Sequence, residues 1–182
     1  MKLAIHQPQY MPWVGYFHKM ASADVFVFLD DVQFKKNEWQ HRNRIRNPQG
    51  WQWLSVPNHY TFPQRINEVA LNRTQRWREK HLKSIEMCYG KAPYYAEYAE
   101  RLKEFYARQW DTMAAVCVDS VKLLAAFIGV TTPVELSSTY NLESQATERL
   151  VAICRHLGAD TYLAGAGGRD YMDLSLFEIG RA

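Results

Sequence analysis

The fold is decided by residues 2–29, which read KLAIHQPQYMPWVGYFHKMASADVFVFL. Residues 2–6 predict a short buried strand that ends at Gln7-Pro8, because proline cannot donate to a strand ladder and restricts the residue before it. Trp13, Phe17 and Met20 then recur at helical spacing. Residues 24–29 are apolar on nearly every position, as expected for a strand covered on both faces in a parallel sheet. The stretch therefore predicts a βαβ unit.

The rest of the chain continues this pattern around a helical segment. Thr74 and Asp111 are the expected N-caps of two helices there, and Gly90 and Gly129 are expected terminators. The remaining predicted elements are a functional loop over 30–48, strands over 51–57, 134–138 and 160–164, and helices over 74–89, 93–109, 111–127 and 143–157. We expect an α/β fold with a mainly parallel, Rossmann-like sheet, a helical insertion over about residues 74–128, and a single domain over residues 1–182.

Length and composition limit the class of protein. The 182 residues are 47% hydrophobic and 14% aromatic, which is enough for one compact domain and excludes a disordered or fibrous chain. No apolar run approaches the ~18 residues of a membrane span, and residues 1–8 lack the features of a signal peptide. We therefore expect a soluble, cytoplasmic protein. Its three cysteines are widely spaced, so neither a disulfide framework nor a zinc finger is indicated.

Positive charge is concentrated in one part of the chain. Residues 35–91 contain twelve Lys or Arg against four Glu and no Asp, although the whole chain has a formal charge of only +3. Such a stretch is typical of a protein that binds an anionic partner, either nucleic acid or a phosphorylated small molecule. A solvated face balanced by acidic residues elsewhere is the alternative.

The turn after the first predicted strand is the most informative motif. In open α/β sheets, ligands bind at the carboxyl ends of strands, where the chain enters the following helix. A histidine at such a strand end can act as an acid, a base or a phosphate contact near neutral pH. The candidate residues of this turn are His6, Gln7, Tyr10 and Trp13, and His18 lies further along the helix.

Asp30, Asp31 and Gln33 follow the second predicted strand, at the same sheet edge. Carboxylates in this place suit a divalent metal such as Mg²⁺ or a sugar hydroxyl. Adjacent aspartates point in different directions, so a turn or a helix cap is the alternative.

A basic stretch over residues 35–46 combines cations with an aromatic ring and amides. Arginine presents a planar fork that matches phosphate or carboxylate, and Trp39 offers a face for a base or a sugar. No recognised nucleic-acid module fits, so a nucleotide or nucleotide-sugar is the favoured anion, with RNA or a plain charged surface as alternatives. The candidate ligand residues are Lys36, Trp39, Arg42, Asn43 and Arg44.

A glycine-rich turn follows the last predicted strand. Glycines allow backbone N–H groups to approach an anion closely, although the pattern is neither a Walker A motif nor a full dinucleotide fingerprint. A tight turn without a ligand is the alternative. The candidate residues are Gly165, Gly167, Gly168, Arg169 and Asp170.

These motifs together resemble the WbqC-like protein family. The resemblance covers nearly the whole chain, from His6-Gln7-Pro8-Gln9-Tyr10 to Arg169-Asp170-Tyr171. It implies a bacterial cytoplasmic protein that takes part in surface-polysaccharide assembly, O-antigen assembly in particular. The positions that match the family motifs are His6, Gln7, Tyr10, Pro12, Trp13, Gly15, Tyr16, Asp30, Asp31, Gln33, Trp39, Arg42, Asn43 and Arg44. We expect members to continue beyond Ala182 into another strand, so a truncated domain is one interpretation of this chain.

Residues and resemblance together lead to three functional hypotheses. The first is a transferase of the acyl, aminoacyl or glycosyl type that modifies a nucleotide-activated sugar or amino sugar, with His6 as general base. The second is a nucleotidylyltransferase-like enzyme in which Asp30 or Asp31 holds Mg²⁺. The third is a non-catalytic nucleotide-binding, RNA-binding or assembly protein that uses residues 35–46.

Overall fold

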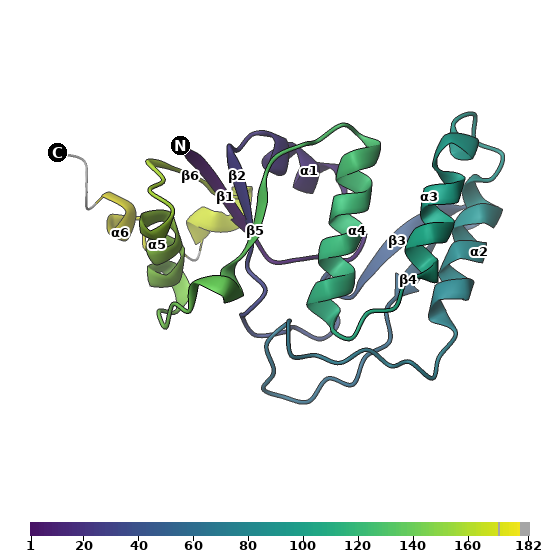
Figure 1. The fold of residues 1–182 in the computed structure, drawn as a ribbon, viewed down its shortest axis with the longest axis horizontal. Helices are drawn as coiled ribbons and strands as arrows, with labels where there is room; N and C mark the ends of the chain where they lie inside the picture. The colour runs from purple at the N-terminus through teal and green to yellow at the C-terminus, as the bar shows by residue number, and fades with distance from the viewer. Residues whose placement is uncertain (171, 179–182) are drawn as a thin grey trace. The chain divides into compact units, whose positions relative to one another are not determined.

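The structure is a computed structural model that describes residues 1–170 and 172–178 (Figure 1). The chain divides into two compact units, and the long middle segment of the chain forms nearly all of the second. The first unit comprises Met1–Gln7, Trp13–Asp31 and Val130–Ala182, and the second comprises Pro8–Pro12 and Val32–Gly129.

The first unit contains a four-stranded sheet in which all neighbouring strands are parallel. Its order is β5-β2-β1-β6, so the two earliest strands occupy the centre. β1 pairs with β2 from Leu3↔Val25 to His6↔Phe28, and with β6 from Lys2↔Thr161 to Ala4↔Leu163. The strands are β1 Lys2–His6, β2 Val25–Phe28, β5 Val134–Leu136 and β6 Thr161–Leu163. The predicted α/β fold with a mainly parallel sheet is therefore confirmed.

Side chains alternate between the two faces of this sheet, and helices cover both faces (Figure 1). On one face, Leu3, Ile5 and Val27 form a core with residues from α5 (Ala146–His156). On the other face, Phe26 packs against Tyr16 of α1 (Val14–Ala21), with 5.4 Å between ring centroids. The short elements of this unit are η1 Ser137–Tyr140, η2 Ala166–Asp170 and α6 Ser175–Glu178.

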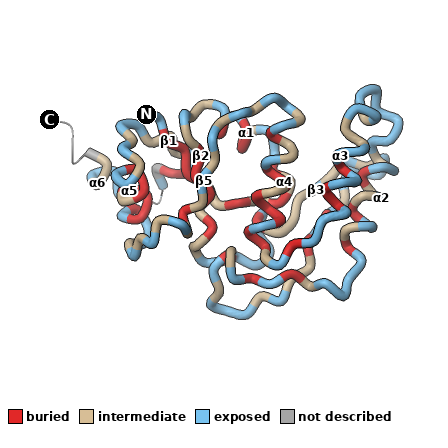
Figure 2. The backbone as a smooth tube through the Cα atoms, viewed as in Figure 1, coloured by how far each residue is buried: buried red, intermediate tan, exposed pale blue. Residues whose placement is uncertain are grey.

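The second unit has three helices and an antiparallel hairpin around a separate core. The hairpin joins β3 (Arg42–Asn47) to β4 (Gly50–Ser55), and Leu54 of β4 is buried. Figure 2 shows how buried and exposed segments are distributed along the chain. The core also contains Tyr10, Phe34 and many residues of the helices, such as Trp77, Phe105 and Met113. The helices are α2 Trp77–Tyr89, α3 Tyr95–Ala107 and α4 Met113–Phe127, so the predicted helical insertion is confirmed.

Three local predictions were wrong. Residues 42–47, expected in a loop, form β3, because each pairs with a residue of β4. Thr74 is not the cap of α2, since its hydroxyl donates to Asn72 instead, over 2.7 Å, and the N-cap position is Arg76. Asp111 is likewise not the cap of α4: Thr112 fills that position, and its hydroxyl accepts a bond from Ala115 N over 3.3 Å.

No helix in the described part of the chain is both long enough and apolar enough to cross a membrane.

Candidate functional site

The strand order of the first unit creates a switch point between β1 and β6. The strands that follow β1 in the chain, β2 and then β5, lie on one side of it, whereas the last strand, β6, lies on its other side. The direction of the strand order therefore reverses between β1 and β6. The parallel register Ala4↔Leu163 brings the end of β1, at His6, next to the start of the glycine-rich turn at Gly165. Crevices at such switch points are where open α/β sheets bind ligands. Two motifs that lie about 160 residues apart in the sequence are thus brought to one sheet edge.

His6 occupies the carboxyl end of β1 and lies against α1. Its ring centroid lies 4.7 Å from that of Tyr16, and its Nδ1 is 3.0 Å from the carbonyl oxygen of Gln7. A carbonyl can only accept, so Nδ1 carries the proton and Nε2 of the neutral ring has a free lone pair. Burial, assisted by the positive charge of Lys19, lowers the pKa of His6 to about 4. The imidazole is therefore neutral at physiological pH and able to accept a proton.

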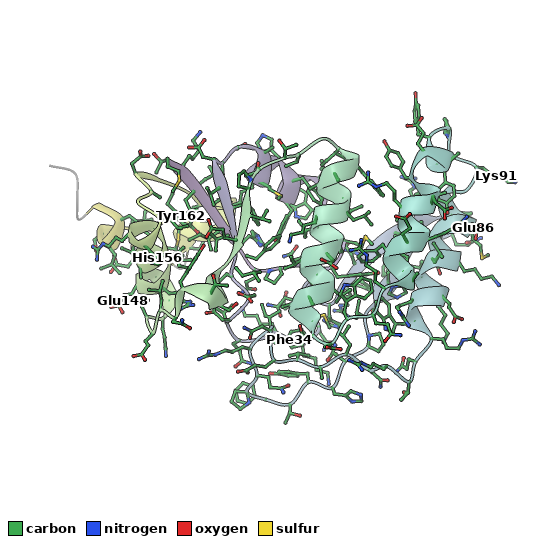
Figure 3. All side chains as sticks on the ribbon, viewed as in Figure 1. Phe34, Glu86, Lys91, Glu148, His156 and Tyr162 are labelled. Carbon is green, nitrogen blue, oxygen red and sulfur yellow. The ribbon has the colours of Figure 1, made fainter. Side chains whose placement is uncertain are left out.

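Lys19 supplies a cation beside His6. Its Nζ donates to the carbonyl oxygen of Ile5 over 2.7 Å and lies 5.9 Å from the ring centroid of Tyr162 of β6, a residue labelled in Figure 3. Burial lowers the pKa of Lys19 to about 8, so the amine is still mostly protonated at neutral pH. Tyr16 completes the cluster by donating its hydroxyl to Gln7 O over 3.0 Å. We call His6, Gln7, Tyr16, Lys19 and Tyr162 the switch-point cluster.

The glycine-rich turn forms the 3₁₀ helix η2 rather than an open loop. Gly168 N donates to Gly165 O over 2.9 Å, and a Cβ on Gly168 would lie only 2.8 Å from Met172 Cε. A side chain at Gly168 would therefore displace the end of the Met172 side chain, whereas Gly165 and Gly167 are exposed and have room around them. Asp170 is exposed, and the Arg169 side chain lies outside the described part of the structure. The predicted phosphate contact of these residues stays a prediction.

Asp30 and Asp31 belong to a buried polar network in the first unit. Ser138 donates to Asp30 from both its backbone N (3.0 Å) and its hydroxyl (2.7 Å), and the Ser137 hydroxyl lies 2.5 Å from Asp31 Oδ1 and 3.2 Å from Asp30 Oδ1. Arg149 of α5 forms an ion pair with Asp31, and both side chains are about nine-tenths buried. The network joins the ends of β2 and β5 to α5. All four carboxylate oxygens therefore already have a donor.

This arrangement bears on the predicted Mg²⁺ site. Mg²⁺ binds through one or two carboxylates and keeps several waters or substrate oxygens. Asp30 is only 3% exposed, and Arg149 already neutralises Asp31. In the part of the chain that the structure describes, no group of three or more His, Cys, Asp or Glu could hold a metal ion. The two carboxylates do not fit a metal site in this arrangement, and we derive no step through Mg²⁺.

Tyr10 belongs to the second unit, whereas the other residues of its predicted motif belong to the first. It is fully buried, and its hydroxyl lies 2.9 Å from His81 Nδ1 and 2.7 Å from the Tyr106 hydroxyl. Asn43 supports the same segment by donating to Met11 O over 2.6 Å, where Met11 has a positive φ of 47°. Gln33 also stabilises the backbone of this unit, since it donates to the carbonyl oxygen of Gln64 over 3.1 Å.

The remaining predicted site residues are exposed, except Arg42, which is half-buried. Trp13 is 69% exposed, and its indole lies over Gly15, where a Cβ would come within 2.1 Å of the ring. His18 lies exposed on α1, and Lys36 lies exposed before β3. Arg42 and Arg44 of β3 lie over indole rings, Arg42 over Trp53 and Arg44 over Trp39, Trp51 and Trp53. The predicted binding roles of these residues stay predictions.

Several residues with a role in these clusters were not singled out from the sequence. Lys19 follows Tyr16 at i+3, so the helical pattern could have placed it on the face of α1 that meets the sheet. Trp51 and Trp53 share a face of a predicted strand by their i, i+2 spacing. Arg149 carries no comparable signal, because its partner Asp31 is 118 residues away.

The fold and the switch-point cluster define the class: a Rossmann-like α/β protein with a neutral histidine and a lysine at a strand switch point. The family comparison identifies it further, since the WbqC-like protein family model matches residues 7–180, and the chain belongs to that family. It is also similar to the uncharacterized protein Rv1507c of Mycobacterium tuberculosis (strain ATCC 25618 / H37Rv), with 34% identity over 180 residues, 97% of this chain and 78% of that protein. No solved structure matches.

Proposed function

We propose that this protein is a transferase that modifies a nucleotide-activated sugar or amino sugar in bacterial surface-polysaccharide (O-antigen) biosynthesis, acting in the cytoplasm. The observation that carries the proposal is the switch-point cluster, where a neutral histidine and a half-buried lysine lie at the edge that open α/β sheets use for nucleotides. Membership of the WbqC-like family supports the polysaccharide context through the resemblance described above.

In this proposal His6 is the general base. Its Nδ1–H is held by the carbonyl oxygen of Gln7, which fixes the ring and leaves Nε2 to take the proton of the acceptor hydroxyl or amine. The acceptor oxygen or nitrogen then bonds to the transferred group, and the bond between that group and the rest of the donor breaks, so that the leaving group departs with the electron pair. Lys19 holds the anionic part of the donor, because a half-buried ammonium group makes a charge-assisted hydrogen bond to a phosphate oxygen. The exposed Trp13 offers an indole face for stacking of the base or sugar.

The test has two stages and uses the whole chain. First, the purified protein is screened by thermal shift against nucleotides, nucleotide-sugars, coenzyme A thioesters and aminoacyl donors, with and without Mg²⁺, because a ligand of the folded state raises its apparent stability. We expect a shift with one class of donor only. Second, mass spectrometry follows transfer from that donor to a panel of nucleotide-activated sugars and amino sugars.

Variants then assign the roles. We expect His6→Ala to lower the turnover number by about 10²–10⁴-fold, and Lys19→Met to weaken donor binding by about tenfold or more. His59→Ala and Lys2→Met are the matched controls, since both side chains are exposed outside the cluster. The acid limb of the pH–rate profile should lie near pH 4, the pKa of His6. Full activity of His6→Ala, or no donor shift at all, would overturn the proposal.

A further inference from the structure

The outer face of the β3–β4 hairpin carries an exposed cluster of indole and guanidinium groups. Arg42, Arg44 and Arg46 alternate along β3 on one face, and in the antiparallel register Arg44 lies opposite Trp53 and Arg46 opposite Trp51. Trp39, from the segment before β3, joins them, with its ring centroid 5.6 Å from that of Trp53. We call Trp39, Arg42, Arg44, Trp51 and Trp53 the hairpin cluster.

The three indoles are unusually accessible for such large apolar side chains. Trp39, Trp51 and Trp53 are 41%, 53% and 38% exposed, respectively. The opposite face of the hairpin is the one that packs inward, through the buried Leu54 and the half-buried Ile45. Grouped exposed aromatic side chains beside arginine are typical of binding surfaces rather than of free surface.

Arg44 is the centre of the hairpin cluster. Its guanidinium carbon lies 4.7 Å from the ring centroid of Trp51, 5.2 Å from that of Trp53 and 5.3 Å from that of Trp39. Among the side chains that the structure describes, no carboxylate forms an ion pair with the Arg44 guanidinium. Contacts with indole rings orient a guanidinium but do not use its N–H donors. These can still donate two parallel hydrogen bonds to one carboxylate. Arg42 is engaged further, because it donates to the carbonyl oxygen of Asn37.

The charge around the hairpin cluster favours an anion. The second unit contains sixteen Lys and Arg against nine Asp and Glu, a formal charge of +7, and neither hairpin strand has an acidic residue. Such a surface attracts an anionic ligand and excludes a cationic one.

The geometry of the rings favours a saccharide over a nucleic-acid strand. The Trp39 and Trp53 planes are inclined by 43° and the Trp51 and Trp53 planes by 81°. Single-stranded nucleic acids stack successive, nearly parallel bases on aromatic platforms along a charged groove. Inclined indoles around one guanidinium instead suit puckered sugar rings, whose C–H groups can pack on the electron-rich faces of the indoles. A single sugar carboxylate can then bind the guanidinium through two hydrogen bonds.

We propose that the hairpin cluster binds an acidic saccharide, with a sugar carboxylate on Arg44 and pyranose faces on the surrounding indoles. The inference goes beyond the proposed function, because it assigns a binding surface to the second unit. The binding itself is independent of the reaction.

The test measures binding without any donor. Oligogalacturonate is titrated into the full chain, and binding is followed by tryptophan fluorescence and by amide chemical shifts of residues 42–55. The methyl ester of the same oligosaccharide is the matched probe, because it keeps the rings and removes the charge. We expect the acid to bind at least tenfold more tightly than the ester, with shifts concentrated in the hairpin.

Variants locate the site. We expect Arg44→Gln and Trp51→Ala each to weaken oligogalacturonate binding by about tenfold, and Arg44→Lys to restore little, because an ammonium group lacks the planar fork. Arg65→Gln and Tyr94→Ala are the controls, since both residues are exposed in the same unit and lie outside the hairpin cluster. Circular dichroism and the melting temperature establish that each variant is folded.

Three results would overturn the inference: no binding of the acid, equal binding of acid and ester, or hairpin shifts with a single-stranded RNA but not with the saccharide. Each can be told apart from a failure of the proposed function, which is measured by donor binding and by turnover at the switch-point cluster.

Discussion

The two units of this protein use charged and polar groups in different ways. The first unit has six Lys and Arg against ten Asp and Glu, a formal charge of −4, whereas the second has a formal charge of +7. In the first unit, the ion pair of Asp31 with Arg149 is about nine-tenths buried. In the second, the buried Tyr10, His81 and Tyr106 are linked by hydrogen bonds and lie among aromatic rings.

This difference indicates where each unit is vulnerable. A buried ion pair costs desolvation energy, and removing one partner leaves the other charged and unpaired. A hydrogen-bonded cluster of neutral groups loses less when one hydroxyl is removed, but it is sensitive to protonation of its histidine. Variants and a change of pH can disrupt one network at a time. Hydrogen exchange of amides in each unit then shows which unit is destabilised.

The largest effect is expected from Arg149→Met in the first unit. The change leaves Asp31 buried without its cation and should lower the free energy of unfolding by about 3–5 kcal/mol. Urea denaturation measures the loss, and amides of α5 should exchange faster. Arg155→Met is the control, because Arg155 is exposed on the same helix. A loss below about 1 kcal/mol would contradict the view that this ion pair organises the sheet edge.

A pH dependence is expected from His81 in the second unit. Burial lowers its pKa from 6.5 to about 4, so the unfolded chain takes up a proton at a higher pH than the folded one. Stability contributed by neutral His81 is therefore complete above pH 6.5 and is lost as the pH falls towards 4, by on the order of 3 kcal/mol. Urea denaturation at pH 7 and pH 4.5 measures this loss. The free energy of unfolding should differ less between the two pH values for His81→Gln than for the wild type. An unchanged difference would refute the assignment, and His59→Gln is the control.

A smaller effect is expected from Tyr10→Phe. The change removes the hydroxyl that lies 2.9 Å from His81 and 2.7 Å from Tyr106, and it leaves their buried polar atoms with one partner fewer. The free energy of unfolding should fall by about 1–3 kcal/mol, with faster exchange in α2 and α3. Tyr94→Phe serves as the control, since Tyr94 is 67% exposed. An unchanged free energy of unfolding would mean that the Tyr10 hydroxyl does not stabilise the cluster.

Much of the first unit follows from the sequence. Successive apolar residues over 25–29 predict a strand covered on both faces, and the helical spacing between Trp13 and Met20 predicts the helix between the first two strands. Local pattern suffices there because the sheet is buried and parallel. The hairpin strand β3 was not predicted, because RNRIRN has no apolar alternation and becomes a strand through its pairing with β4.

The sequence also predicted that His6 lies at a strand end. It is a candidate site residue for that reason, since strand ends before helices are where ligands bind in this class of fold. It did not indicate that Tyr10, only four residues later, contributes to the core of the other unit. The division of residues 6–18 between two units depends on long-range contacts, such as Tyr10 with His81 and Tyr106.

The sequence by itself therefore determined the class of fold, the predicted insertion and the histidine at the sheet edge, because these depend on patterns within a few residues. Only the tertiary structure decided the partners: Lys19 beside His6, Arg149 on Asp31, and three indoles around Arg44. The physical reason is that the protonation state and accessibility of a side chain depend on what packs against it, and those neighbours come from distant parts of the chain.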